Sequence, residues 1–191
     1  MKRQQPQPLG YQQQESSCWI TSIMNAMIFL HGYAGKIPNE IARILYAIAS
    51  KDGTDNDEAE RIINFINAYE KLQIKCDLYE GEKVTEEKLR SIITNGSVII
   101  ADVQAGCHSV LVTGIDNGTG KLKIFDPDWS AVCERGRDVT IVKDKPAYNS
   151  LVPFEEFFKK RMHENASLRM GGVQSRSWVV LSLLKKNVSS K

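Results

Sequence analysis

Cys18 opens an apolar helical pattern six residues after Gln12, a spacing that suits thiol chemistry. A cysteine attacks as the thiolate, which a helix N-terminus and a nearby imidazolium both favour. A side-chain amide just upstream can stabilise the oxyanion that forms when the thiolate attacks a carbonyl. His108 begins a strand-like apolar run, and Asp126 follows it by 18 residues. These four residues predict an enzyme with a cysteine nucleophile.

Each predicted residue has one chemical role. His108 would take the Cys18 proton and later give it to the leaving amine. Asp126 would hold the imidazole by its other nitrogen and so fix its tautomer. Gln12 would donate its amide to the oxyanion, together with the Cys18 backbone N–H. His108 is favoured over the other two histidines because only it precedes an apolar strand.

Each of these residues also has a purely structural interpretation. Cys18 could be a buried core thiol, His108 a hydrogen-bonded core histidine, and Asp126 a turn residue before proline. Gln12 could be a solvated residue of a glutamine-rich arm, and two neighbours compete for its role if the loop register differs. Two tryptophans could wall a cleft, although the first suits core packing better. These alternatives are Gln13 and Gln14 for the amide, and Trp19 and Trp129 for the cleft wall.

Apolar spacing predicts helices first and an antiparallel sheet after them, which is an α+β plan with two lobes. Ser16 or Ser17 would cap the first helix, which carries apolar residues to Ile28 and stops near Gly32. A turn within residues 116–120 predicts a hairpin that joins the His108 strand to the Asp126 strand. The other expected elements are a helix from Pro38 to Ile48, a helix that follows a loop and cap at 51–55 and carries apolar residues from Ile62 to Tyr69, a strand from Ile74 to Tyr79, a helix capped by Thr85, strands at 98–101, 110–112, 122–125 and 139–142, a helix from Pro153 to Met162, and a strand from Trp178 to Leu184.

Composition limits the classes of protein that fit. A chain of 191 residues with 42% apolar residues suits one domain over residues 1–191, with mobile ends at 1–10 and 186–191. The net charge of only +2 does not indicate nucleic-acid binding. No apolar run reaches the roughly 18 residues of a membrane span, and no secretory signal is visible. We therefore expect a cytoplasmic protein, although one exported by a leaderless route would have the same sequence features.

The four cysteines do not form a disulfide or metal framework. Without an export signal, Cys18, Cys76, Cys107 and Cys133 are expected to be reduced. A zinc site built on Cys107 and His108 fits poorly, because adjacent ligands do not have the usual gap of about two to four residues. The cysteine pattern therefore predicts no metal and no cofactor.

The motifs Gln12, Ser17-Cys18-Trp19, His108 and Asp126-Pro127 resemble those of the papain-like cysteine peptidases. The order of elements over about residues 10–130 is most similar to the compact bacterial branch, the double-glycine leader peptidases of bacteriocin exporters and related domains. The resemblance implies a papain-like two-lobe fold, peptide-bond hydrolysis by Cys18, His108 and Asp126, Gln12 as oxyanion donor, and no metal.

The chain departs from these relatives around the nucleophile. Glu15, Ser16 and Ser17 stand where the larger papain-type enzymes have Cys-Gly-Ser, so the disulfide of that cysteine should be absent. Trp19 stands where the leader peptidases usually have glycine. Two competing functions use the same residues: acyl transfer, in which an amine replaces water in the second step, and a non-catalytic peptide-binding module. The complete set of four groups favours an enzyme over a binding module.

Overall fold

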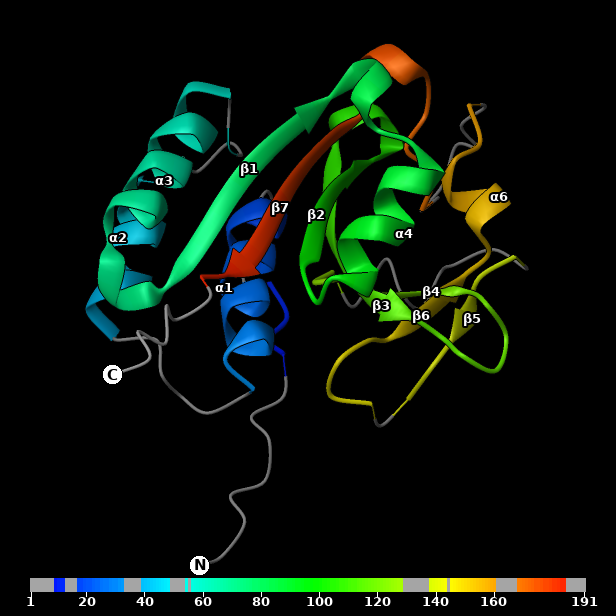
Figure 1. Ribbon diagram of the computed structural model, residues 1–191, viewed down its shortest axis with the longest axis horizontal. Coiled ribbons are helices and arrows are strands. Elements are labelled where there is room, and N and C mark those ends of the chain that lie inside the picture. The colour runs from blue at the N-terminus through cyan, green and yellow to red at the C-terminus, as the bar shows by residue number, and fades with distance from the viewer. Residues whose placement is uncertain are drawn as a thin grey trace, which may run out of the picture.

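The computed structural model describes residues 9–12, 17–32, 39–48, 54, 56–128, 138–143, 145–160 and 168–184. Within these residues the chain forms helices and one sheet (Figure 1). The helices are α1 (Cys18–Leu30), α2 (Asn39–Ile48), α3 (Asn56–Ala68), α4 (Glu86–Thr94) and α6 (Phe154–Phe157). The strands are β1 (Ile74–Glu80), β2 (Val98–Val103), β3 (His108–Ile115), β4 (Leu122–Phe125), β5 (Thr140–Ile141), β6 (Ser150–Val152) and β7 (Ser177–Leu183).

The strands form one antiparallel sheet in the order β1-β7-β2-β3-β4-β6-β5. The late strand β7 lies between β1 and β2, so the end of the described chain takes an interior position next to the edge strand β1 (Figure 1). The predicted hairpin between β3 and β4 is confirmed, and the Asp116 N–H donates to the Lys121 carbonyl across its turn at 2.8 Å. Because Leu111 pairs with Phe125, the hairpin brings the end of β4 near the start of β3.

Alternate side chains of the sheet enter two separate cores. Along β2, Val98 and Ile100 pack with α1, α2 and α3, while Ile99, Ala101 and Val103 pack on the other face with α4 and α6. In Figure 1, α2 and α3 lie beside β1, whereas α6 lies at the opposite end of the sheet. The predicted α+β class is therefore confirmed, with helices covering both faces of an antiparallel sheet.

Helix α1 is the central helix, as its broad apolar face predicts. Ser17 is its N-cap residue and accepts a hydrogen bond from the Thr21 N–H through its carbonyl at 3.0 Å. Gly32 ends the helix at a φ of +68°, a conformation that glycine adopts without strain. Ile23 and Met27 are fully buried. The helix therefore fixes its first residue, Cys18, against the sheet.

Two predicted helices differ from the observed ones. The apolar residues Ile41, Ile44, Leu45 and Ile48 of α2 predict one buried side, but Ile44 is 40% exposed, and only Ile41 and Leu45 are fully buried. Helix α6 spans four residues and ends well before Met162. The Met170 N–H donates a hydrogen bond to the Phe157 carbonyl at 3.0 Å, and the Arg176 guanidinium donates one to the Phe158 carbonyl. These long-range donors occupy acceptors that a longer helix needs for its own bonds.

The remaining differences are small. The strand expected at 139–142 is the two-residue β5, and β6, which pairs with β4, was not expected because its apolar run is short. Thr85 caps α4 as predicted and accepts from the Lys88 N–H at 3.2 Å. In the described part of the chain, no helix combines the length and the apolar character that a membrane crossing requires.

Candidate active site

Cys18 lies at the start of α1, in a cleft of about 1440 Å³ between the helices and the sheet. Burial has the largest effect on its pKa and raises it, but the pKa of the thiol is still held below its ordinary value. A hydrogen bond with His108, the charge of His108, and hydrogen bonds with the backbone and side chain of Ser109 lower the pKa by more than burial raises it. The thiol therefore lies where its anionic form is favoured.

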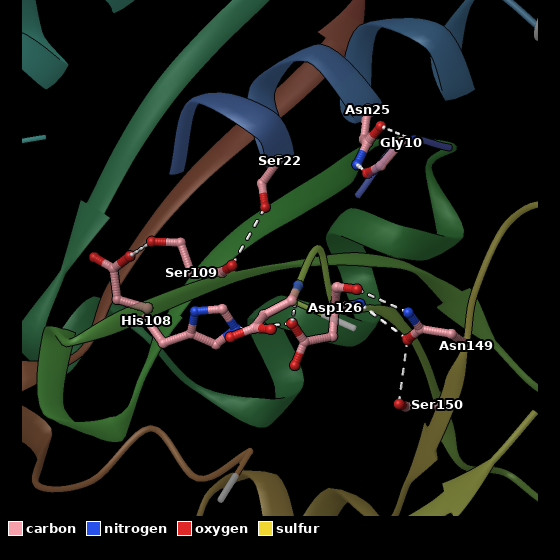
Figure 2. A network of polar contacts seen from close by, with 10 residues as sticks. Gly10, Ser22, Asn25, His108, Ser109, Asp126, Asn149 and Ser150 are labelled. Carbon is pink, nitrogen blue, oxygen red and sulfur yellow. Dashed lines mark hydrogen bonds and ion pairs between the residues drawn. The ribbon is translucent and has the colours of Figure 1, made fainter. Parts of the chain in front are cut away.

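His108 is the first residue of β3, and its buried ring points toward Asp126 (Figure 2). Its Nε2 lies 2.8 Å from Oδ1 of Asp126, which is fully buried directly after β4. A carboxylate only accepts hydrogen bonds, so Nε2 carries the proton in this pair. Nδ1 is then the nitrogen left for the Cys18 sulfur. The structure thus brings together the three residues that the sequence predicts as a triad.

Asp126 is held in place by Asn149, which the sequence did not indicate. The Asn149 amide donates to the Asp126 carbonyl at 2.7 Å and accepts from the Asp126 N–H at 3.0 Å. Ser150 donates its hydroxyl to the same amide oxygen at 3.2 Å (Figure 2). The Asp128 N–H also donates to the Asp126 carboxylate at 2.8 Å. Backbone and side chain of Asp126 are therefore both fixed before any substrate binds.

The main chain of Gln12 hydrogen-bonds to Pro127, the residue after Asp126. Its N–H donates to the Pro127 carbonyl at 2.8 Å, and its Oε1 is buried and accepts no hydrogen bond from the described residues. Two residues earlier, Gly10 exchanges two hydrogen bonds of 2.8 Å with the Asn25 side chain of α1 (Figure 2). Gln12 is not among the described residues that line the cleft. Its role as oxyanion donor stays a prediction.

The segment before Gln12 is more ordered than expected. Leu9 is only 4% exposed and belongs to the core around α1, and Gly10 is tied to Asn25. Both residues thus contact the folded domain, and the mobility predicted for residues 1–10 stays a prediction. The rest of that arm and residues 185–191 lie outside the described residues, as do Gln13, Gln14, Trp129 and Cys133.

Ser109 links the nucleophile helix to the sheet. The Ser22 hydroxyl of α1 donates to the Ser109 carbonyl at 3.3 Å, one turn after Cys18 (Figure 2). The Ser109 hydroxyl in turn donates to Oδ1 of Asp102 on β2 at 2.7 Å. Burial raises the pKa of Asp102 to about 6, although hydrogen bonds from Ser109 and Ser177 and the charge of His108 oppose this rise.

Sequence reasoning missed Asn25, Asn149, Ser109 and Asp102. A weak signal existed for Asn25, an amide side chain that is only 2% exposed in a helix whose other polar side chains are the hydroxyls of Thr21 and Ser22. The others lie on or beside paired strands, and local patterns do not encode the register of that pairing. Trp19 is buried in the core, as expected, and its edge also lines the cleft.

Cys107 is exposed and its thiol is free, as are those of Cys18 and Cys76. Among the residues that the structure describes, no group of three or more His, Cys, Asp or Glu side chains is placed to hold a metal ion.

Comparison with known proteins gives one family match. The model of a family described as papain-like cysteine protease AvrRpt2 matches residues 1–140. Among solved structures, the peptidase domain of Streptococcus ComA, described as a bi-functional ABC transporter involved in a quorum-sensing pathway, is similar. It has 15% sequence identity and a TM-score of 0.48, and the match covers 92% of this chain and 96% of that chain. The search of curated proteins found no match.

Proposed function

We propose, for a chain that belongs to the papain-like cysteine protease AvrRpt2 family, that Cys18, His108 and Asp126 are the catalytic triad. Membership of this family makes the protein a cysteine peptidase, as the sequence motifs predict, and implies a peptide substrate. The finer assignment, which residues act and how, is our proposal. We propose that Cys18 attacks a peptide carbonyl to form an acyl-enzyme, and that water then hydrolyses this acyl-enzyme.

One observation carries the proposal: a cleft thiol with a lowered pKa contacts an imidazole that is itself held by a buried carboxylate. The nucleophile, the base and the group that orients the base thus lie in series, which is the arrangement of nucleophilic catalysis. A structural core cysteine has no need of this environment. Cys76 illustrates the contrast, because burial raises its pKa to about 12 and no imidazole offsets that effect.

Acylation follows from the geometry of these groups. The Cys18 thiolate attacks the substrate carbonyl and forms a tetrahedral oxyanion. The imidazolium of His108 then gives its Nδ1 proton to the leaving amine, the C–N bond breaks, and a thioester with Cys18 remains. The hydrogen bond from Nε2 to Asp126 keeps the ring facing the sulfur and stabilises its positive charge.

Deacylation uses the same residues in the reverse roles. His108 is now neutral and accepts a proton from a water molecule, which attacks the thioester carbonyl. Collapse of the second tetrahedral oxyanion expels the Cys18 thiolate and releases a carboxylic acid. The imidazolium and the thiolate are both restored, so the cycle consumes one peptide bond and one water.

Gln12 is proposed to stabilise both oxyanions with its side-chain amide. Replacing Gln12 by alanine should lower kcat/KM by about 10²–10³-fold, which is typical for loss of one oxyanion donor. Its main-chain bond to Pro127 does not involve the side chain, so the variant should keep the loop in place. Steady-state cleavage of a fluorogenic peptide measures the loss. Gln13→Ala is the matched control and should retain most of the activity; a larger loss in that control would assign the donor to the neighbouring residue.

Product analysis tests the proposed reaction. We expect peptides incubated with the enzyme in heavy-oxygen water to carry heavy oxygen in one newly formed carboxyl group. Acid quenching during turnover should leave the acyl group on the tryptic peptide that contains Cys18. Products that carry an added amine instead would show acyl transfer. An acyl group found on another residue, or no cleavage of any peptide, would refute the assignment.

A further inference from the structure

Asp102 lines the same cleft as Cys18 and His108. On β2 it pairs with Ser109, the residue directly after His108. Ser109 contacts both sides: its hydroxyl donates to the Asp102 carboxylate at 2.7 Å, and its backbone hydrogen-bonds to the Cys18 sulfur. The carboxylate is therefore separated from the nucleophile by a single residue. A substrate side chain next to the bond under attack would come within reach of it.

Among the described residues, Asp102 has hydroxyl partners and interacts with the charge of His108, but it has no Lys or Arg partner. Ser109 and Ser177 hydrogen-bond to it, and no Lys or Arg in the described residues forms an ion pair with it. Its burial raises its pKa to about 6, so it is mostly ionised near neutral pH at a cost in solvation. A cation brought by a ligand would recover part of that cost, because an ion pair in a partly buried site is weakly screened.

The wider cleft also favours a cation. The other charged side chains that line the cleft are three carboxylates and one guanidinium: Asp57 and Glu60 on α3, Glu80 at the end of β1, and Arg176 before β7. Arg176 donates to the carbonyls of Phe158, at 2.8 Å, and Gly171, at 3.4 Å. Two of its five N–H donors are thus engaged by backbone carbonyls. The charge balance of the cleft remains negative.

We propose that Asp102 is a specificity-determining residue that binds a lysine or arginine side chain of the substrate, within two residues of the bond that is cleaved. This inference rests on the proposed function, because it takes Cys18 as the point of attack. No covalent step is involved: the substrate cation pairs with the carboxylate and displaces water from the cleft. The effect is on the selection of peptides and is separate from the chemistry of the triad.

Matched peptides test this assignment. A cleavable peptide is made with lysine or with norleucine, an uncharged side chain of similar length, at each of the two positions on either side of the bond. The wild-type enzyme should cleave the lysine peptide with at least about tenfold higher kcat/KM at one position, which is the scale of a formed charge pair. In Asp102→Asn the lysine-to-norleucine ratio should fall to about one.

Asp77→Asn provides a matched control. It makes the same chemical change on β1 at an exposed carboxylate that pairs with Lys75 at 2.8 Å and does not line the cleft. The wild-type ratio should persist in this variant. Circular dichroism of all three proteins establishes that they share one fold.

The wild-type enzyme alone gives a second test, which applies even if Asp102→Asn fails to fold. The lysine-to-norleucine ratio should fall as the pH decreases through about 6, because protonation neutralises Asp102. Ionisation of Cys18 and His108 affects both peptides equally and cancels in the ratio. Other titratable or charged groups line the same cleft and are present for both peptides, so they do not change the ratio by themselves. They are Cys18 on α1, His108 on β3, Asp57 and Glu60 on α3, Glu80 on β1, and Arg176.

The outcomes separate this inference from the proposed function. Equal cleavage of lysine and norleucine peptides at every position would overturn the role of Asp102 and leave the triad intact. Preference for a glutamate peptide would also overturn it and would make Arg176 the determinant. Cleavage of no peptide at all would overturn both proposals. A ratio that depends on Asp102 and falls at acidic pH would establish the inference.

Discussion

Replacing Cys18 by alanine is expected to lower kcat/KM for peptide cleavage by at least about 10⁴-fold, the scale seen when a catalytic nucleophile is removed. The substitution deletes the only atom that can form the acyl-enzyme. It leaves intact the hydrogen bonds that His108, Asp126 and Asn149 make with one another, because none of these involves the sulfur. Cleavage of a fluorogenic peptide, measured with enzyme in excess, gives the residual rate.

Cys107→Ala is the matched control for this loss. Cys107 is an exposed free thiol next to His108 in sequence, and it lies outside the proposed triad. We expect this variant to keep most of its activity. Retention of activity in Cys18→Ala together with its loss in Cys107→Ala would contradict the assignment of the nucleophile.

Replacing His108 by alanine should have two linked effects. Loss of the general base should reduce kcat/KM by at least about 10²–10⁴-fold. The same change removes the hydrogen bond and the charge that oppose burial of the thiol, so the pKa of Cys18 should rise to or above its ordinary value. At neutral pH the thiolate fraction then falls as well. The two effects act in the same direction, so the total loss should exceed that of general-base catalysis alone.

His31→Ala separates these effects from the general loss of a histidine. His31 is the C-cap residue of α1, at the end opposite Cys18. Its contribution to the helix is a backbone N–H that donates to the Met27 and Phe29 carbonyls, which alanine preserves. Activity and thiol reactivity close to wild type are expected. A loss in His31→Ala as large as that in His108→Ala would indicate that the decrease comes from the fold.

Local patterns in the sequence predicted the elements that carry the site. The apolar spacing after Ser17 defines α1 and puts Cys18 at its first turn. Turn residues around Gly118 define the β3–β4 hairpin, and the hairpin brings His108 and Asp126 together although 18 residues separate them. In both cases the relevant contacts form between neighbours in sequence or across one tight turn. Such contacts leave periodic and compositional signals.

The parts of the site that were missed depend on how the strands pair. Asn149 hydrogen-bonds to Asp126 from 23 residues away. Asp102 and Ser109 are near in sequence, but they meet only because β2 and β3 pair in one particular register. A polar residue that satisfies a distant backbone group has the same type and spacing as a surface residue. Only the register of the sheet reveals its role. The early end of α6 was missed for a similar reason, because Met170 and Arg176, which are distant in sequence, donate hydrogen bonds to the carbonyls at its end.

The proposed catalysis depends on a Cys18 thiolate stabilised by His108, and the pH dependence of alkylation measures this stabilisation directly. Rates of iodoacetamide labelling, resolved by mass spectrometry for Cys18, Cys76 and Cys107, are recorded for the wild type and for His108→Ala. Cys18 should label fastest, with a midpoint below the free-thiol value of about 8.5, and the midpoint should move upward in the variant. A Cys18 profile that rises only near about 8.5 in both proteins would contradict the account.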